Sequence, residues 1–177
     1  MEGDALHLES AIADGLEYSE AISRLLDDGV PPRGFQIFVE EGVKGCEDAD
    51  VVLSPYKILI LSERVVEQLR KIQNIRARFF EVPITKKQEN TARKFFIVSF
   101  EVLCDPLSKE SMMTRLRNGT EVILEPVLNA RNIPNDAEMF RVRNHKGFMI
   151  CTETVAKILK QLGKKGLTVS RVRVAND

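Results

Sequence analysis

The sequence predicts an α/β (α+β) fold in which duplicated strand–helix–strand units surround a mixed β-sheet. The first observation is a repeat, because residues 60–65 realign with residues 150–155. The second is that each copy continues into apolar residues at three- and four-residue spacing, the pattern of a helix packed on a sheet. The third is a basic, β-branched run after each helix, at Arg76 to Val82 and at Leu167 to Val174. Two such units would bury their apolar faces in one layered core.

The first 34 residues have a different character from the rest of the chain. Residues 5–15 and 19–28 each have Leu, Ile and Ala at helical spacing, and Gly29 supplies a left-handed exit from the second segment. Pro31-Pro32 then interrupts the chain. These signals predict a short acidic helical cap segment over residues 1–34.

The remainder, residues 35–177, is predicted to be a single α/β domain that contains the two units. The units lie at about 56–84 and 139–174. Phe35 to Val39 alternates as a strand and precedes the first unit.

The first unit begins with Ile58 to Leu61, an apolar run typical of a buried strand. Ser62 is expected to accept a hydrogen bond from a free amide of the next turn, and the glutamate after it suits the positive end of a helix dipole. We therefore expect a helix over Glu63–Gln73. Leu69, and Leu159 at the equivalent place in the second unit, should be buried against the sheet.

The second unit repeats this start at Thr152, and the spacing predicts a helix over Glu153–Leu162. Before it, Met139–Arg143 and Phe148–Cys151 are predicted to form a hairpin that turns at residues 144–147.

Three segments lie between the units. Lys94 to Leu103 is dense in Phe, Ile and Val and is expected to be a central strand. Ser108 to Leu116 is predicted to form a short helix, and Glu121 to Leu124 a short strand.

Composition favours a folded protein that is not embedded in a membrane. Hydrophobic residues make up 44% and charged residues 29% of the 177, and no apolar run is long enough to cross a bilayer. The first residues, 1–4, lack the basic and hydrophobic features of a secretory signal, so we expect a cytoplasmic protein. The cysteines Cys46, Cys104 and Cys151 have no metal-ligand spacing, and we expect reduced thiols, with the last two buried.

The sequence offers no recognisable catalytic constellation. Its only histidines, His7 and His145, are expected on a helix and in a turn, far from any nucleophile pattern. No GxGxxG, GxxxxGK[ST] or HExxH motif occurs. We therefore expect neither an enzyme nor a bound cofactor or metal.

Charge is segregated along the chain although the net charge is zero. Up to Leu53 there are 13 acidic and three basic residues, a balance of −10, so the remainder carries +10. Either the acidic segment folds back on the basic body, or it presents an acidic face to a partner. The first candidates for partner contact lie on a glycine-containing stretch expected to be an exposed loop: Glu40, Glu41, Glu47, Asp48 and Asp50.

Pairs of arginines spaced by two supply an alternative. On a strand, such pairs share one face, and adjacent strands could form a basic face that contacts phosphates. The same alternation arises when arginine occupies the solvent side of a half-buried strand. Tryptophan is absent and no aromatic stacking motif accompanies the arginines, so we do not expect a nucleic-acid partner. The pairs are Arg76 and Arg78, Arg141 and Arg143, and Arg171 and Arg173.

Several short motifs resemble the eleventh immunity-protein family of bacterial polymorphic-toxin systems. The likeness spans about residues 33–174, and the chain departs from the family pattern at Phe95-Phe96, where tyrosines are usual. The motifs that carry it are Ile-Leu-Ser-Glu-Arg-Val at 60–65, Phe-Phe-Glu-Val-Pro-Ile at 79–84, Val-Leu-Cys-Asp-Pro-Leu at 102–107, Met-Phe-Arg-Val-Arg at 139–143 and Ile-Cys-Thr-Glu-Thr-Val at 150–155.

The resemblance implies a cytoplasmic immunity protein that binds a cognate secreted toxin effector and blocks it by direct occlusion. If the toxin is a nuclease, its substrate groove is basic, and the acidic segment could occupy that groove in place of phosphate. Arg141 and Arg143 would be further candidates for contact. The alternative remains a nucleic-acid-binding regulator or enzyme that uses the Arg-rich sheet face.

Overall fold

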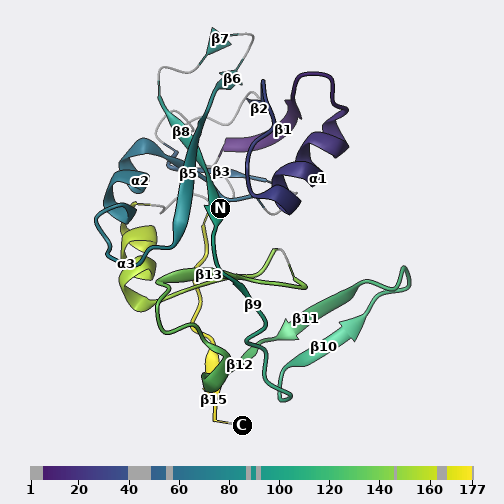
Figure 1. Cartoon of the computed structure of the whole chain (residues 1–177), viewed down its shortest axis with the longest axis vertical. Helices are drawn as coiled ribbons and strands as arrows, with labels where there is room; N and C mark the ends of the chain where they lie inside the picture. The colour runs from purple at the N-terminus through teal and green to yellow at the C-terminus, as the bar shows by residue number, and fades with distance from the viewer. Residues whose placement is uncertain are drawn as a thin grey trace.

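The computed structural model of the chain describes residues 6–39, 49–54, 58–86, 89–90, 93–145, 147–162 and 167–176. The fold is mixed α+β, as the sequence predicts, with helices on both sides of a large sheet and smaller sheets below it (Figure 1). The helical elements are α1 (Tyr18–Asp28), α2 (Glu63–Leu69), α3 (Glu153–Leu162) and a 3-10 turn, η2 (Ala130–Asn132).

Eight strands of the described residues form the main sheet, in the order β5-β8-β4-β3-β1-β2-β6-β7. The β1–β3 and β2–β6 pairs are parallel and the other pairs are antiparallel, so the sheet is mixed. These strands are β1 (Leu6–Ile12), β2 (Gln36–Val39), β3 (Val51–Leu53), β4 (Ile60–Ser62), β5 (Ala77–Val82), β6 (Ile84–Lys86), β7 (Glu89–Asn90) and β8 (Phe95–Phe100).

Three smaller sheets follow in the lower half of the view in Figure 1. In the first, β13 (Met139–Val142) lies between β14 (Met149–Cys151) and β9 (Leu103–Cys104). In the second, β12 (Val127–Asn129) pairs in parallel with β15 (Arg173–Ala175). The third is a two-stranded antiparallel ribbon of β10 (Met112–Arg115) and β11 (Glu121–Glu125).

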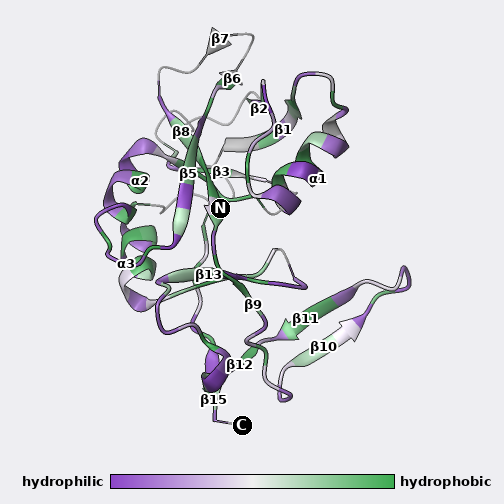
Figure 2. Ribbon diagram, viewed as in Figure 1, coloured by the Kyte–Doolittle hydropathy of each residue, from purple (hydrophilic) through white to green (hydrophobic). Residues whose placement is uncertain are grey.

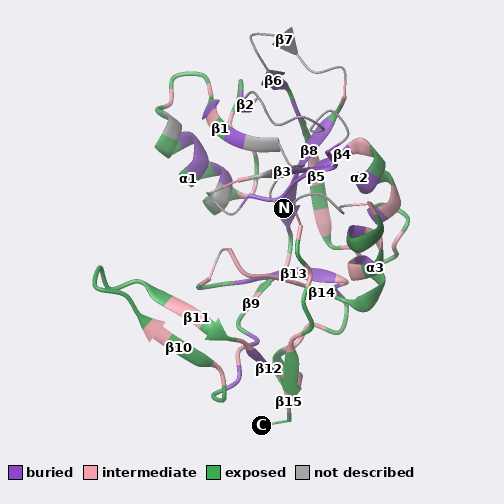
Figure 3. Cartoon of the chain, turned by 180° about the vertical axis from the view of Figure 1, so that it is seen from behind, coloured by how far each residue is buried: buried purple, intermediate pink, exposed green. Residues whose placement is uncertain are grey.

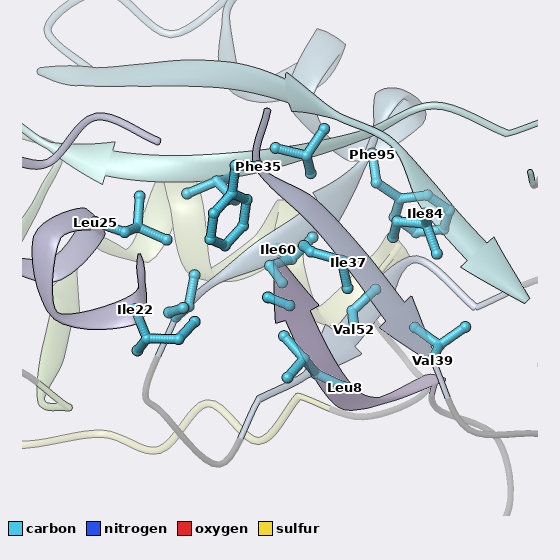
Figure 4. Packing of buried hydrophobic residues seen from close by; sticks show 14 of the residues in the cluster. Leu8, Ile22, Leu25, Phe35, Ile37, Val39, Val52, Ile60, Ile84 and Phe95 are labelled. Carbon is cyan, nitrogen blue, oxygen red and sulfur yellow. The ribbon is translucent and has the colours of Figure 1, made fainter. Parts of the chain in front are cut away.

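Two hydrophobic cores lie on opposite faces of the central strands. Along β8, Phe95 and Ile97 belong to the core beneath α1, whereas Phe96 and Val98 belong to the core beneath α2 and α3. Successive residues of a strand point to opposite faces, so a strand covered on both faces is apolar throughout. Figure 4 shows the first core, in which side chains from α1 meet those of the strands. Both cores confirm that residues 95–100 form a central strand.

The predicted helices of the two units begin where the sequence places them. Helix α3 has the predicted bounds, and α2 begins at Glu63 but ends at Leu69 instead of Gln73. Leu69 and Leu159 are buried, as predicted, in the core that α2 and α3 share. The cap prediction for Ser62 is wrong, because its side chain makes no cap hydrogen bond and donates instead to the carboxylate of Asp50.

The two units resemble each other in their strand–helix start, and their returning strands differ. In the first unit, β4 leads into α2 and the chain returns as β5, next to β8 in the main sheet. In the second, β14 leads into α3, but β15 pairs with β12 in a separate sheet. The repeat therefore specifies the strand and helix that begin each unit, but it does not specify which sheet the returning strand joins.

The N-terminal segment joins the main sheet, so the predicted separate cap over residues 1–34 is wrong. Residues 6–12 form β1, which pairs with both β2 and β3, where a helix was expected over 5–15. A shift in register between Leu8 and Ser10 explains the error. It buries both Leu8 and Ala11, and this three-residue spacing imitates a helix. The second predicted helix is confirmed as α1, which ends at Gly29 with φ 66°.

The segment predicted as a short helix, residues 108–116, instead supplies strand β10. Its partner β11 confirms the strand expected at 121–124. Asn118-Gly119 lies between the two strands, and Gly119 has φ 84°. An Asn-Gly pair between apolar runs is a strong hairpin signal, which the high helix propensity of residues such as Met112, Met113 and Arg115 obscured.

Candidate functional site

The predicted acidic loop lies largely outside the described residues. Glu40, Glu41, Glu47 and Asp48 are in this undescribed part, so their role stays a prediction. Asp50 is described, and the expectation that it is exposed is wrong: its exposed fraction is 3%.

Asp50 instead joins three parts of the chain. The Ser62 hydroxyl donates to its Oδ1 at 2.6 Å, and the Arg93 guanidinium donates to the same oxygen at 3.1 Å. Arg64 forms a second ion pair with its other oxygen. A buried carboxylate is tolerated when cations and hydrogen-bond donors surround it, and these three residues do so here. Asp50, which directly precedes β3, therefore connects β3 to the start of α2 and to Arg93.

Arg141 and Arg143, the other predicted contact residues, lie in different environments. Arg141 is 7% exposed, with its guanidinium carbon 4.9 Å from the centre of the Phe100 ring. Burial lowers the pKa of Arg141, because the charged form loses solvation. Arg143 is exposed and donates to the carbonyl of Leu103 at 3.2 Å. Only Arg143 is therefore placed for external contact.

The arginine pairs do not form one basic sheet face, because their strands belong to three different sheets. Arg76 pairs with Asp136 at 2.6 Å and with Glu101 at 3.5 Å. Arg173 pairs with Glu110 at 2.8 Å. The arrangement on which the nucleic-acid alternative depends is absent from the described residues.

A small hollow separates the end of α1 from β8, β9 and β13. Its volume is about 110 Å³, whereas pockets for small-molecule ligands are typically about 300–1,000 Å³. Its polar lining combines two aspartates with two arginines, so the formal charges balance. A β-carbon on Gly29 would lie 2.8 Å from the Ser99 hydroxyl oxygen, which shows how closely the helix end approaches the sheet. The polar lining residues are Asp27, Asp28, Arg78, Ser99 and Arg141.

Cysteine and metal-ligand chemistry is sparse in the described ranges. They contain no group of three or more His, Cys, Asp or Glu side chains that could hold a metal ion. Cys104 and Cys151 are free thiols, half-buried where full burial was expected, and burial raises the pKa of both. Cys46 lies outside the described residues. No helix among the described residues is long and apolar enough to cross a membrane.

The β10–β11 ribbon is the most distinctive exposed surface of the described chain, and the sequence analysis missed it. It projects away from the body (Figure 1), and none of its strand residues is buried (Figure 3). Hydrophobic residues nevertheless make up much of β11, and β10 is more weakly hydrophobic (Figure 2). Its most exposed apolar side chains, with their exposed fractions, are Met112 (56%), Met113 (44%), Leu116 (49%) and Leu124 (58%).

The base of the ribbon is firmly attached. The Ser111 hydroxyl donates to the carbonyl of Val127 at 2.8 Å and accepts from its amide at 3.0 Å. Arg173 of β15 lies opposite Val127 and also pairs with Glu110, so the C-terminal strand contacts the chain just before and just after the ribbon. These contacts fix where the ribbon leaves the body.

The tip of the ribbon is ordered by its own hydrogen bonds and is basic. The amide of Leu116 donates to the carbonyl of Thr120 at 2.8 Å, and the amide of Gly119 donates back to Leu116 at 2.9 Å. Arg115, Arg117 and Glu121 are all exposed there, and Glu121 lies directly opposite Arg115. Neither arginine forms an ion pair with a described residue. The two arginines outnumber the one glutamate, so the tip of the ribbon is positive.

Comparisons with known proteins add no relative from which a role could be transferred. No model of a known protein family matches the chain, and no curated protein matches it either.

Proposed function

We propose that this chain is an immunity protein that binds a cognate toxin effector of bacterial competition and neutralises it by direct occlusion. The observation that carries the proposal is the β10–β11 ribbon, whose apolar side chains are exposed on a projecting element. Contiguous exposed apolar surface commonly marks a site of protein interaction. The choice of a toxin as the bound protein rests on the short motifs that resemble those of the eleventh immunity-protein family.

The acidic N-terminal part supports the proposal in a weaker way. Glu17 and Glu20 of the α1 region are exposed, and the ion pairs of Glu20 and Asp14 are with Arg24 and Arg33 of the same segment. Part of the acidic charge therefore remains available to accelerate association with a basic partner. Asp50 behaves differently, because it forms ion pairs with Arg64 and Arg93 of the body. This residue supports the other interpretation of the charge segregation, in which the acidic segment neutralises the body internally.

The alternative function, a nucleic-acid-binding regulator or an enzyme that uses an Arg-rich face, has less support. The strands that carry the arginine pairs lie in separate sheets, and Arg141 is buried. Arg76 and Arg173 form ion pairs with carboxylates of this chain. Arg78, Arg143 and Arg171 remain exposed, but three arginines on separate elements make a small phosphate-binding surface.

The test uses the product of the gene next to that of this chain, which under this proposal encodes the toxin domain. We expect the two purified proteins to form a stoichiometric complex by size-exclusion chromatography with light scattering. Co-production of this chain should also restore growth of cells that produce the toxin. Absence of both complex and protection would contradict the proposal, and salt-dependent binding of labelled RNA or DNA would favour the alternative.

A further inference from the structure

We propose that the β10–β11 ribbon enters a cleft of the partner protein, one with apolar walls and a floor that carries carboxylates. This inference rests on the proposed function and specifies the chemistry of the partner. It depends on three features of the ribbon: apolar side chains on both faces, a basic tip and a fixed base.

Both faces of the ribbon carry apolar side chains. Met113 lies directly opposite Ile123, and Thr114 lies directly opposite Val122. Opposed residues of an antiparallel pair share a face, and successive pairs point to opposite faces. Both faces are accessible in part, since Met113 is 44% exposed on one face and Val122 is only half-buried on the other. A flat partner could cover one face, whereas the walls of a cleft cover both.

The charge of the ribbon tip indicates which charge the floor of the partner's cleft must carry. Arg115 and Arg117 extend from the end of the ribbon, where the Nε of Arg115 also donates to the carbonyl of Gly119 at 3.2 Å. A cleft that receives these two guanidinium groups also receives the carboxylate of Glu121, which lies opposite Arg115. One positive charge remains unbalanced, so the floor of the cleft requires a carboxylate of its own, because unpaired buried charge is costly. Carboxylates occupy this position in the active sites of glycoside hydrolases and of enzymes that hold catalytic Mg²⁺. The ribbon would thus block catalysis by filling such an active site.

The fixed base favours insertion as a preformed element. An isolated two-stranded hairpin is marginally stable in water. The Ser111–Val127 hydrogen bonds and the Arg173–Glu110 ion pair hold this one in place, so less ordering is required when it binds. The charged tip also argues against insertion into a lipid bilayer, because both arginines would have to enter the membrane first.

Two adjacent cysteine substitutions test whether both faces are covered. Met113→Cys and Thr114→Cys place thiols on opposite faces, and Lys71→Cys, in the exposed turn that follows α2, is the control. Alkylation at each site is followed by mass spectrometry, with and without the toxin domain encoded by the neighbouring gene. We expect the complex to slow alkylation of both ribbon cysteines by about tenfold or more, because a buried interface excludes water. Lys71→Cys should react at an unchanged rate.

A charge reversal tests the acidic floor. The double variant Arg115→Glu and Arg117→Glu should bind the toxin domain about tenfold more slowly than the wild type and lose its salt dependence. Lys71→Glu, which reverses an exposed charge on another element, should change neither property. An unchanged association rate in the double variant would overturn the acidic floor.

The outcomes separate this inference from the function on which it rests. A complex in which only one ribbon cysteine, or neither, is protected would overturn insertion and leave the proposed function standing. Failure of the wild-type protein to form any complex would overturn both. Ribbon-dependent binding to phosphatidylglycerol vesicles, or ribbon-dependent dimerisation by light scattering, would assign the ribbon to a membrane or to a second copy and would also overturn insertion.

Discussion

Replacing Leu69 with alanine should lower the free energy of unfolding by about 3 kcal/mol. Leu69 is fully buried in the core between the main sheet and the helices α2 and α3. The substitution removes three methylene-sized groups, worth about 0.8 kcal/mol each, or about 2.4 kcal/mol. A residual cavity of about 40 Å³ would add about 1 kcal/mol at 24 cal/mol per Å³.

The assay is urea denaturation followed by circular dichroism, with Leu124→Ala as the matched control. Leu124 is 58% exposed on the ribbon, so the same substitution there should cost less than about 0.5 kcal/mol. A loss of unfolding free energy below about 0.5 kcal/mol for Leu69→Ala would refute the burial of the apolar face of α2. A comparable loss for Leu124→Ala would show that the ribbon packs against the body.

Three further predictions concern other parts of the chain. Asp50→Ala should destabilise by about 2–3 kcal/mol, because the buried Ser62 hydroxyl loses its acceptor, and adding Ser62→Ala should restore part of the loss in the same denaturation assay. Arg173→Ala should leave the melting temperature nearly unchanged but speed hydrogen exchange of the β10–β11 amides, since it removes the ion pair to Glu110; equal exchange rates would contradict a role at the base. The raised pKa of Cys151 leaves less thiolate at neutral pH, so its alkylation should be slower than that of a free cysteine and should rise only at higher pH; a midpoint at or below the ordinary thiol value would contradict this.

Local sequence signals predicted the elements that depend on local contacts. The start at Thr152 and the apolar spacing after it gave the bounds of α3, and the run at 94–103, dense in Phe, Ile and Val, gave the central strand β8. In both segments, the intrinsic secondary-structure propensity of the residues and the spacing of the apolar residues agree with the way the segment packs in the fold. Such agreement is what makes a segment predictable from its own residues.

The errors in the fold arose where tertiary pairing overrode a local pattern. In β1, an irregular register buries residues three apart, so alternation is lost from the sequence. In β10, residues with high helix propensity pair with β11 because the Asn118-Gly119 turn brings the two strands together. Periodicity within one segment does not reveal either effect.

The candidate site was harder to predict because burial depends on distant residues. Asp50 looked exposed among neighbouring acids, but its partner Arg93 lies 43 residues away in the sequence. Arg141 looked like a surface residue of an alternating strand, yet it packs over Phe100. The ribbon could have been found, because Asn118-Gly119 between two apolar runs predicts a hairpin, although its projection from the body could not.

The most direct test of the central claim is the affinity of the neighbouring toxin domain for Leu124→Glu, measured by calorimetry against wild type and Ile12→Glu. Ile12 is 50% exposed on β1, so its substitution introduces the same charge at a similarly exposed apolar site outside the ribbon. We predict that Leu124→Glu weakens binding at least about 30-fold, or about 2 kcal/mol, as expected for a central interface residue, and that Ile12→Glu binds as wild type does. Equal affinities for wild type and Leu124→Glu, with both proteins folded, would contradict the claim that the ribbon binds the partner.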